Sequence, residues 1–221
     1  MESNPPEFLL ASYPRSANHW IRYIIEFLSQ QPTTGEGNRN HERKDPAIFK
    51  RLGQESHYKQ ATPIAVKRHW VRKSDDRSSK MILIVRDYRE VIYRHMDKAF
   101  SIFRLRILNK NIRMYNDLIQ HYNAWPTDKI AIKYEDLINE PAPTITRLAQ
   151  FIGKTELLED LLQNIDEHQK CCVKMYDIRS GSETKGKSTK YHSKKYSPRW
   201  ERYLNHRIEG LYAPLFHNST P

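Results

Sequence analysis

The sequence has no long apolar run, only two cysteines and only seven glycines among its 221 residues. A helix that spans a membrane needs an apolar run of about 18 residues or more, so we expect no such helix. Cys171 and Cys172 are adjacent, a spacing that matches no common metal motif and does not favour a disulfide between them. The N-terminus also lacks the pattern of a secretory signal peptide. Together these absences predict a cytoplasmic protein without a metal site.

The length and composition fit one folded domain that spans residues 1–221. A chain of this length fills one hydrophobic core well and is too short for two comfortable ones. Hydrophobic residues make up 38% and charged residues 29% of the sequence, which is typical of a globular protein with a polar surface.

The formal net charge of +11 indicates an anionic partner. Nucleic acid is the usual partner of so basic a protein. A polyanionic small molecule, an acidic acceptor or simply a solvated basic surface explains the charge as well. Much of the charge lies near the C-terminus, at Lys185, Lys187, Lys190, Lys194, Lys195, Arg199, Arg202 and Arg207.

The Walker A pattern G-x-x-x-x-G-K-[ST] is also absent, which argues against a P-loop kinase. The sequence nevertheless predicts a phosphate site in residues 8–20, FLLASYPRSANHW. An apolar strand ends there at Tyr13, and a helix with a 3.6-residue apolar pattern begins near Asn18. The N–H groups of the first helical turn and the helix dipole favour an anion in the connecting loop. Arg15 and Ser16 add a cation and a hydroxyl at the same place.

Three later segments are predicted strands that contain or precede polar residues. They span residues 63–70, 80–86 and 128–137. Because ligands of α/β proteins bind at the carboxyl ends of parallel strands, we expect Arg15, His69 and Arg86 to lie at one edge of the sheet. Taken alone, each segment also has a purely structural interpretation, such as a surface histidine or an Arg–Asp pair at a helix start. Further helices are predicted at about residues 46–52, 99–125, 141–152, 156–164 and 166–175. Gly153 is expected to form the C-terminal cap of the third of these helices.

Residues 13–20, YPRSANHW, resemble the 5′-phosphosulfate loop of the sulfotransferases that use PAPS (3′-phosphoadenosine-5′-phosphosulfate). That loop reads approximately Y-P-[KR]-S-G-[TN]-T-W. Ala17 stands where the family usually has glycine, and His19 stands where it has a phosphate-contacting threonine. Lys67-x-His69 is similar to the family's K-[TS]-H segment, whose histidine is the catalytic base.

The segment around Arg86 resembles the family's 3′-phosphate segment, roughly I-x-[VL]-x-R-[DN]-x-[RK]-[DE]-V-x-x-S. Arg86 matches the arginine that contacts the nucleotide 3′-phosphate, and Arg94 replaces a phosphate-binding serine. Tyr134 begins a match to the segment Y-E-D-[LM]…P…FLG, whose tyrosine approaches the adenine. Lys185-Gly186 resembles part of the family's R-K-G loop, which closes over the 3′-phosphate.

The resemblance spans roughly residues 8–187 and implies a single α/β domain, with four or five mostly parallel strands and helices on both faces. It implies transfer of a sulfuryl group from PAPS to an acceptor hydroxyl, with PAP as product. The implied catalytic residues are His69 as general base, Arg15 at the leaving oxygen and Lys67 as a second cation. The implied cofactor-binding residues are Arg15, Ser16, Ala17, Asn18, His19, Trp20, Arg86, Arg94, Tyr134, Lys185 and Gly186. We expect residues 31–45 to form a mobile surface loop and residues 178–198 a basic loop that closes over the cofactor.

The alternative is a non-catalytic protein on the same fold that binds polyanions or nucleic acid. The net charge supports it, and so do Ala17 and His19. If the residue at position 17 has a positive φ, alanine costs on the order of 1 kcal/mol there relative to glycine. Nucleic acid is the less favoured partner, and no membrane partner is expected. The sequence leaves open the oligomeric state and whether the acceptor is a phenol, an alcohol, a sugar or a peptide tyrosine.

Overall fold

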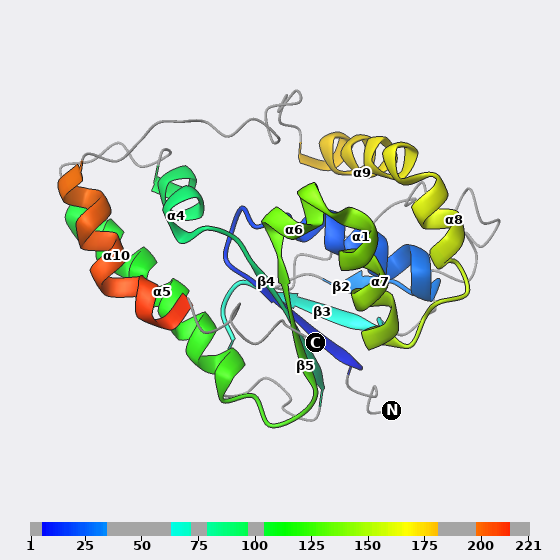
Figure 1. The fold of residues 1–221 in the computed structure, drawn as a ribbon, viewed down its shortest axis with the longest axis horizontal. Helices are drawn as coiled ribbons and strands as arrows, with labels where there is room; N and C mark the ends of the chain where they lie inside the picture. The colour runs from blue at the N-terminus through cyan, green and yellow to red at the C-terminus, as the bar shows by residue number, and fades with distance from the viewer. Residues whose placement is uncertain (1–5, 35–62, 72–78, 97–103, 181–197, 213–221) are drawn as a thin grey trace.

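The computed structural model describes residues 6–34, 63–71, 79–96, 104–180 and 198–212 (Figure 1). The predicted helix at residues 46–52 lies outside these ranges. So do Lys185, Gly186 and most of the two predicted loops, 31–45 and 178–198.

The described chain is built on a five-stranded sheet in which every pair of neighbouring strands is parallel. The strands are β1 (Phe8–Ser12), β2 (Thr33–Thr34), β3 (Ala65–Arg68), β4 (Lys80–Val85) and β5 (Lys129–Lys133), in the order β2-β3-β1-β4-β5. This confirms the predicted parallel sheet of four or five strands. The prediction of a loop from residue 31 is wrong at Thr33–Thr34, which forms an edge strand because its backbone pairs with β3.

Alternate residues of the central strand β1 face two separate cores, as the period of two in a strand requires. Phe8 and Leu10 pack into the core beneath α1 (Asn18–Ser29) and α7 (Pro141–Ile152). Leu9 and Ala11 pack into the other core. That second core is covered by α4 (Tyr88–Met96), α5 (Arg104–Asn123) and α10 (Pro198–Tyr212). Helices therefore lie on both faces of the sheet, as expected for a parallel sheet (Figure 1).

The remaining helices are α6 (Tyr134–Asn139), α8 (Leu158–Gln163) and α9 (Ile165–Ser180). The prediction of one strand over residues 128–137 is wrong in its second half, because the chain becomes helical at Tyr134. Glu135 and Asp136 occupy the first turn of α6, where carboxylates favour a helix start. The predicted C-terminal cap at Gly153 is confirmed, with a φ of 65° after α7.

The consequence for function is that four strand ends meet at one edge of the sheet. β3, β1, β4 and β5 are adjacent in that order, and each ends there in a loop or a helix start. No helix in the described part of the chain is long and apolar enough to cross a membrane.

Candidate active site

The connection from β1 to α1 is the centre of the site. Arg15 and Ala17, on either side of Ser16, both have positive φ, at 74° and 59°. The N–H groups of Trp20 and Ile21 bond to the carbonyl of Ala17, at 3.0 and 3.3 Å, so α1 begins directly at the loop. Turns of this kind point successive backbone N–H groups into one concave space, which favours an anion.

Ser16 adds a hydroxyl to that anion-binding loop. Its side chain is fully buried, and its Oγ has no hydrogen-bond partner in the described structure. A buried hydroxyl normally finds a partner, because leaving one unmade is costly. The Oγ therefore fits a site in which an anionic ligand oxygen completes its hydrogen bonding.

Ser12, at the end of β1, ties the loop to its neighbours. Its Oγ accepts a hydrogen bond of 2.6 Å from the Nδ2 of Asn18. Its carbonyl oxygen lies 2.9 Å from the Nδ1 of His69, one residue beyond the end of β3. Sequence reasoning missed Ser12, because its role depends on a backbone carbonyl and on the neighbouring strand.

The hydrogen bond to Ser12 decides which nitrogen of His69 carries a proton. A carbonyl oxygen can only accept, so Nδ1 must be the donor. In the neutral imidazole the lone pair is then on Nε2, the nitrogen that a general base uses. His69 is half-buried, between the β1–α1 loop and the exposed ring of Trp70, which meets it edge-on at 6.3 Å.

Arg86, directly after β4, is the most firmly held cation of the site. Only 5% of the residue is exposed. Its Nη1 donates to the carbonyl of Arg15 at 3.0 Å, which joins the end of β4 to the loop. Its Nη2 lies 3.6 Å from the Oε1 of Glu90, and its guanidinium stacks 3.9 Å from the ring centre of Tyr134. The structure thus brings three predicted residues, Arg15, Arg86 and Tyr134, into one connected group.

Glu135 links the ends of β4 and β5 beside Arg86. Its Oε1 accepts a hydrogen bond of 3.0 Å from the backbone N–H of Asp87, at the start of α4. Its Oε2 is buried and has no hydrogen-bond partner in the described structure.

Arg89, two residues after Asp87, has a pKa above its ordinary value. Burial acts to lower this pKa, but the hydrogen bond to Asp87 and the interactions with the charges of Asp87, Tyr88 and Glu201 raise it more.

The other predicted site residues differ in how exposed they are. Arg15 and His19 are exposed, whereas Lys67 is half-buried in β3. Trp20 is buried against Tyr23, with ring centres 5.5 Å apart, and its Nε1 has no hydrogen-bond partner in the described structure. The backbone of Arg94 lies in α4, two turns beyond Arg86, and its side chain is outside the described part.

The arrangement joins an anion-binding loop, a buried arginine and a histidine whose Nε2 carries the lone pair. Such a site can hold two anionic groups of one ligand and accept a proton beside them. Among the described residues, no group of histidine, cysteine, aspartate and glutamate has the geometry to bind a metal ion.

The chain matches the family described as "Sulfotransferase domain" over residues 5–213. Its structure is similar to that of mouse sulfotransferase SULT7A1, solved in complex with PAP. The TM-score is 0.55 at 15% identity, covering 97% of this chain and 85% of the mouse chain, and it shows a shared fold. A sulfotransferase from Alicyclobacillus acidocaldarius aligns over 95% of this chain and 94% of its own, at 12% identity with a TM-score of 0.42. The sulfotransferase domain of the Synechococcus PCC 7002 olefin synthase aligns over 69% and 75%, at 17% identity and a TM-score of 0.42.

Proposed function

This chain belongs to the sulfotransferase domain family, an enzyme family that uses PAPS, and from that premise we propose that it transfers a sulfuryl group from PAPS to an acceptor hydroxyl. The observation that carries the proposal is the hydrogen bond between His69 and the Ser12 carbonyl. In the neutral imidazole this contact favours the proton on Nδ1 and the lone pair on Nε2, which supports Nε2 as the base beside the β1–α1 loop.

His69 is the general base of this proposal. PAPS supplies a sulfuryl group bonded to a phosphate oxygen that is a good leaving group. Nε2 of His69 removes the proton of the acceptor hydroxyl as the oxygen–sulfur bond forms. The bond between sulfur and the phosphate oxygen breaks, so PAP and a sulfated acceptor are the products and His69 holds the proton.

The β1–α1 loop and Arg15 stabilise the charge that develops on the departing phosphate oxygen. The backbone N–H groups, the Ser16 hydroxyl and the α1 N-terminus are fixed before the ligand arrives, which is the condition for effective electrostatic catalysis. The Arg15 guanidinium stays charged, so it contributes a cation and not a proton. Half-buried Lys67 adds positive charge from β3.

We propose that the nucleotide end of PAPS binds at the carboxyl ends of β4 and β5. Arg86 is a buried cation at the carboxyl end of β4, held by the Arg15 carbonyl and by Glu90 and stacked on Tyr134. The 3′-phosphate is its proposed ligand, because a guanidinium can bind a phosphate through two parallel hydrogen bonds. Arg94, in α4, is the second proposed contact of this phosphate. Tyr134 and Trp20 are the proposed neighbours of the adenine. Lys185 and Gly186 are proposed as cofactor-binding residues from their resemblance to the family loop alone.

The same geometry also supports a protein that binds PAP or another polyanion without turnover. Ala17 favours this second candidate, because it adopts a φ of 59° where the related proteins use glycine. Transfer of labelled sulfate from PAPS to a panel of phenols, alcohols, sugars and tyrosine peptides separates the two. A sulfated product establishes the enzyme. PAP that raises the melting temperature, without transfer to any acceptor, favours the binding protein. No response to PAP contradicts the enzyme and any PAP-binding protein alike.

A further inference from the structure

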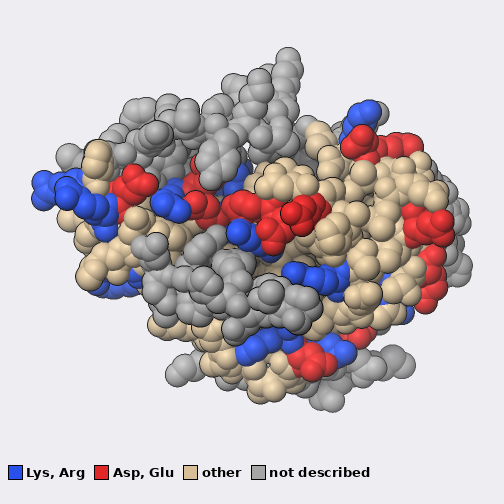
Figure 2. Space-filling model, viewed as in Figure 1, with Lys and Arg blue, Asp and Glu red and all other residues tan. Residues whose placement is uncertain are grey.

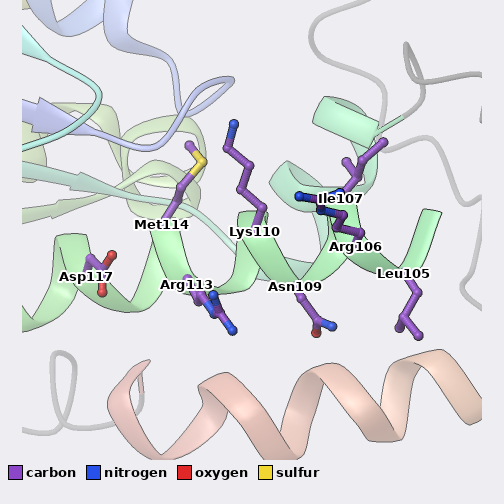
Figure 3. A pocket seen from close by; sticks show the side chains of 8 residues that line it. All are labelled: Leu105, Arg106, Ile107, Asn109, Lys110, Arg113, Met114 and Asp117. Carbon is purple, nitrogen blue, oxygen red and sulfur yellow. The ribbon is translucent and has the colours of Figure 1, made fainter. Parts of the chain in front are cut away.

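A small cleft lies between α5 and α10, outside the set of residues assigned above. Its volume is about 210 Å³, and its lining comprises Asn109, Ile112, Arg113 and Asn116 on α5 and Arg207 on α10. The α5 residues recur at three- and four-residue spacing, so they share one face of the helix. Figure 3 shows Asn109 and Arg113 projecting toward α10, whereas Lys110 projects to the other side. Small-molecule sites usually have volumes of about 300–1,000 Å³, so this cleft fits a single chemical group.

Two hydrogen bonds join the helices at the cleft. The hydroxyl of Tyr203 on α10 donates to the Oδ1 of Asn109 at 2.6 Å. The Nδ2 of Asn116 donates to the carbonyl of Arg207 at 3.0 Å. Ile208, the next residue of α10, is fully buried in the core that α5 also covers. The walls of the cleft are therefore fixed before a ligand arrives, which lowers the entropic cost of binding.

The cleft receives an arginine from each of its two walls. The Arg207 guanidinium lies 5.7 Å from the ring centre of Tyr203, the residue that bonds to Asn109, and Arg113 follows Asn109 by one helical turn. Both arginines are exposed, and neither forms a salt bridge with a carboxylate of the described ranges. Asp117 is the single acidic residue of α5. In Figure 2 the end of the molecule formed by α5 and α10 shows blue atoms, whereas red atoms gather at the opposite end, around α8 and α9.

We propose that this cleft binds a phosphate group, either as inorganic phosphate or as the phosphomonoester of a larger molecule. A planar guanidinium donates two parallel hydrogen bonds to a phosphate. A phosphomonoester carries a charge of about −1.5 to −2 at pH 7, which matches two guanidiniums better than the single charge of a carboxylate does. The hydrogen bond from Tyr203 fixes the Oδ1 of Asn109 as an acceptor, so its Nδ2 is a neutral donor for the same ligand. The site is distinct from the candidate active site, so it exists whether or not the chain transfers sulfate.

Two titrations followed by ¹H–¹⁵N NMR test the site, one with inorganic phosphate and one with phenyl phosphate. We expect saturable shifts of the backbone N–H signals of Asn109, Arg113 and Arg207, and no saturable shift with sodium chloride at equal ionic strength. Arg113→Met or Arg207→Met should weaken binding about 10- to 100-fold, the range for lost hydrogen bonds to a charged group. Arg113→Lys keeps the charge without the planar pair of donors and should weaken binding less. Lys170→Met, which removes an exposed cation from α9 on the other face of the sheet, is the control and should leave binding unchanged.

Saturation by inorganic phosphate assigns the site to the free ion, and saturation by phenyl phosphate alone assigns it to a phosphate ester. Shifts that do not saturate with either probe, or that sodium chloride reproduces, overturn the site. Binding that survives both Arg113→Met and Arg207→Met, or that Lys170→Met weakens equally, overturns the cleft as its location. The signals of the β1–α1 loop report phosphate bound at the candidate active site separately, so failure of the cleft and failure of the proposed function are distinguishable.

Discussion

The two halves of the candidate site hold their cations in opposite ways. In the half formed by β4 and β5, Arg86 is 5% exposed and is tied to the Arg15 carbonyl, to Glu90 and to the Tyr134 ring. In the half formed by β1 and β3, Arg15 is exposed and extends from a turn with positive φ. We therefore expect the same residues to support both nucleotide binding and stability in the first half. In the second half, the groups proposed for chemistry should be separable from stability.

The largest effect on stability should come from Arg86→Ala. It removes the guanidinium that pairs with the carboxylate of Glu90, and breaking a buried pair in this way costs about 3–5 kcal/mol. Urea unfolding should report this loss of free energy of unfolding, and PAP affinity should fall with it. The double variant Arg86→Ala/Glu90→Ala should recover part of the stability but none of the affinity. A free energy of unfolding equal to that of the wild type would contradict the proposed difference between the two halves.

Arg15→Ala should show the opposite behaviour. The side chain is exposed and its backbone carbonyl, which accepts from Arg86, remains, so the melting temperature should barely change. Turnover should fall by about 10²- to 10³-fold, the usual loss when a donor to developing charge is removed, and PAP affinity should also decrease. Arg15→Lys serves as the matched control and should retain much of the activity. A large drop in melting temperature with little change in turnover would contradict the comparison.

Glu135→Ala tests the β4–β5 half without removing a cation. It deprives the backbone N–H of Asp87 of its acceptor, which should lower the free energy of unfolding by about 1–3 kcal/mol. We expect weaker PAP binding, because the link between the ends of β4 and β5, next to Arg86 and Tyr134, is lost, while turnover at saturating PAPS stays near that of the wild type. A change confined to turnover would assign Glu135 to the chemistry instead.

The sequence predicts the framework of the molecule better than its contacts. β1, α1 and β4 follow from uninterrupted apolar patterns, and Gly153 follows from the preference of glycine for a left-handed helix cap. The strand predicted over residues 128–137 extends past the start of α6 at Tyr134, because the alternating pattern of β5 continues into that helix. The acidic residues at the first turn of α6 were the signal to stop the strand there.

In the candidate site, too, a contact between residues near in sequence was predictable and contacts between distant residues were not. Glu90 was predictable in principle, since it lies four residues after Arg86 on a predicted helix. The roles of Ser12 and Glu135 were not, because each depends on which strands and helices become neighbours. The predicted cost of alanine at position 17 depends on a positive φ there, and Ala17 has a φ of 59°.

The smallest effect should come from Ala17→Gly. Alanine at a φ of 59° costs about 1–2 kcal/mol, and glycine loses about 0.5–1 kcal/mol through its freer unfolded chain. The variant should therefore gain up to about 1 kcal/mol in free energy of unfolding, with turnover equal to or above that of the wild type. Ala142→Gly in α7, where the backbone is helical, should gain nothing. A loss of stability in Ala17→Gly would show that the loop is not strained at this residue.

Turnover and PAP affinity measured together in His69→Ala test the central claim most directly. His69 is the proposed general base and is proposed to face the acceptor, so sulfate transfer should fall by about 10²- to 10⁴-fold. PAP should bind as it does to the wild type, and the fold should survive loss of one partly buried hydrogen bond to Ser12. His206→Ala, which removes an exposed histidine from α10, should leave both quantities unchanged. Wild-type transfer by His69→Ala would contradict the assignment of the base, even though the chain belongs to the family.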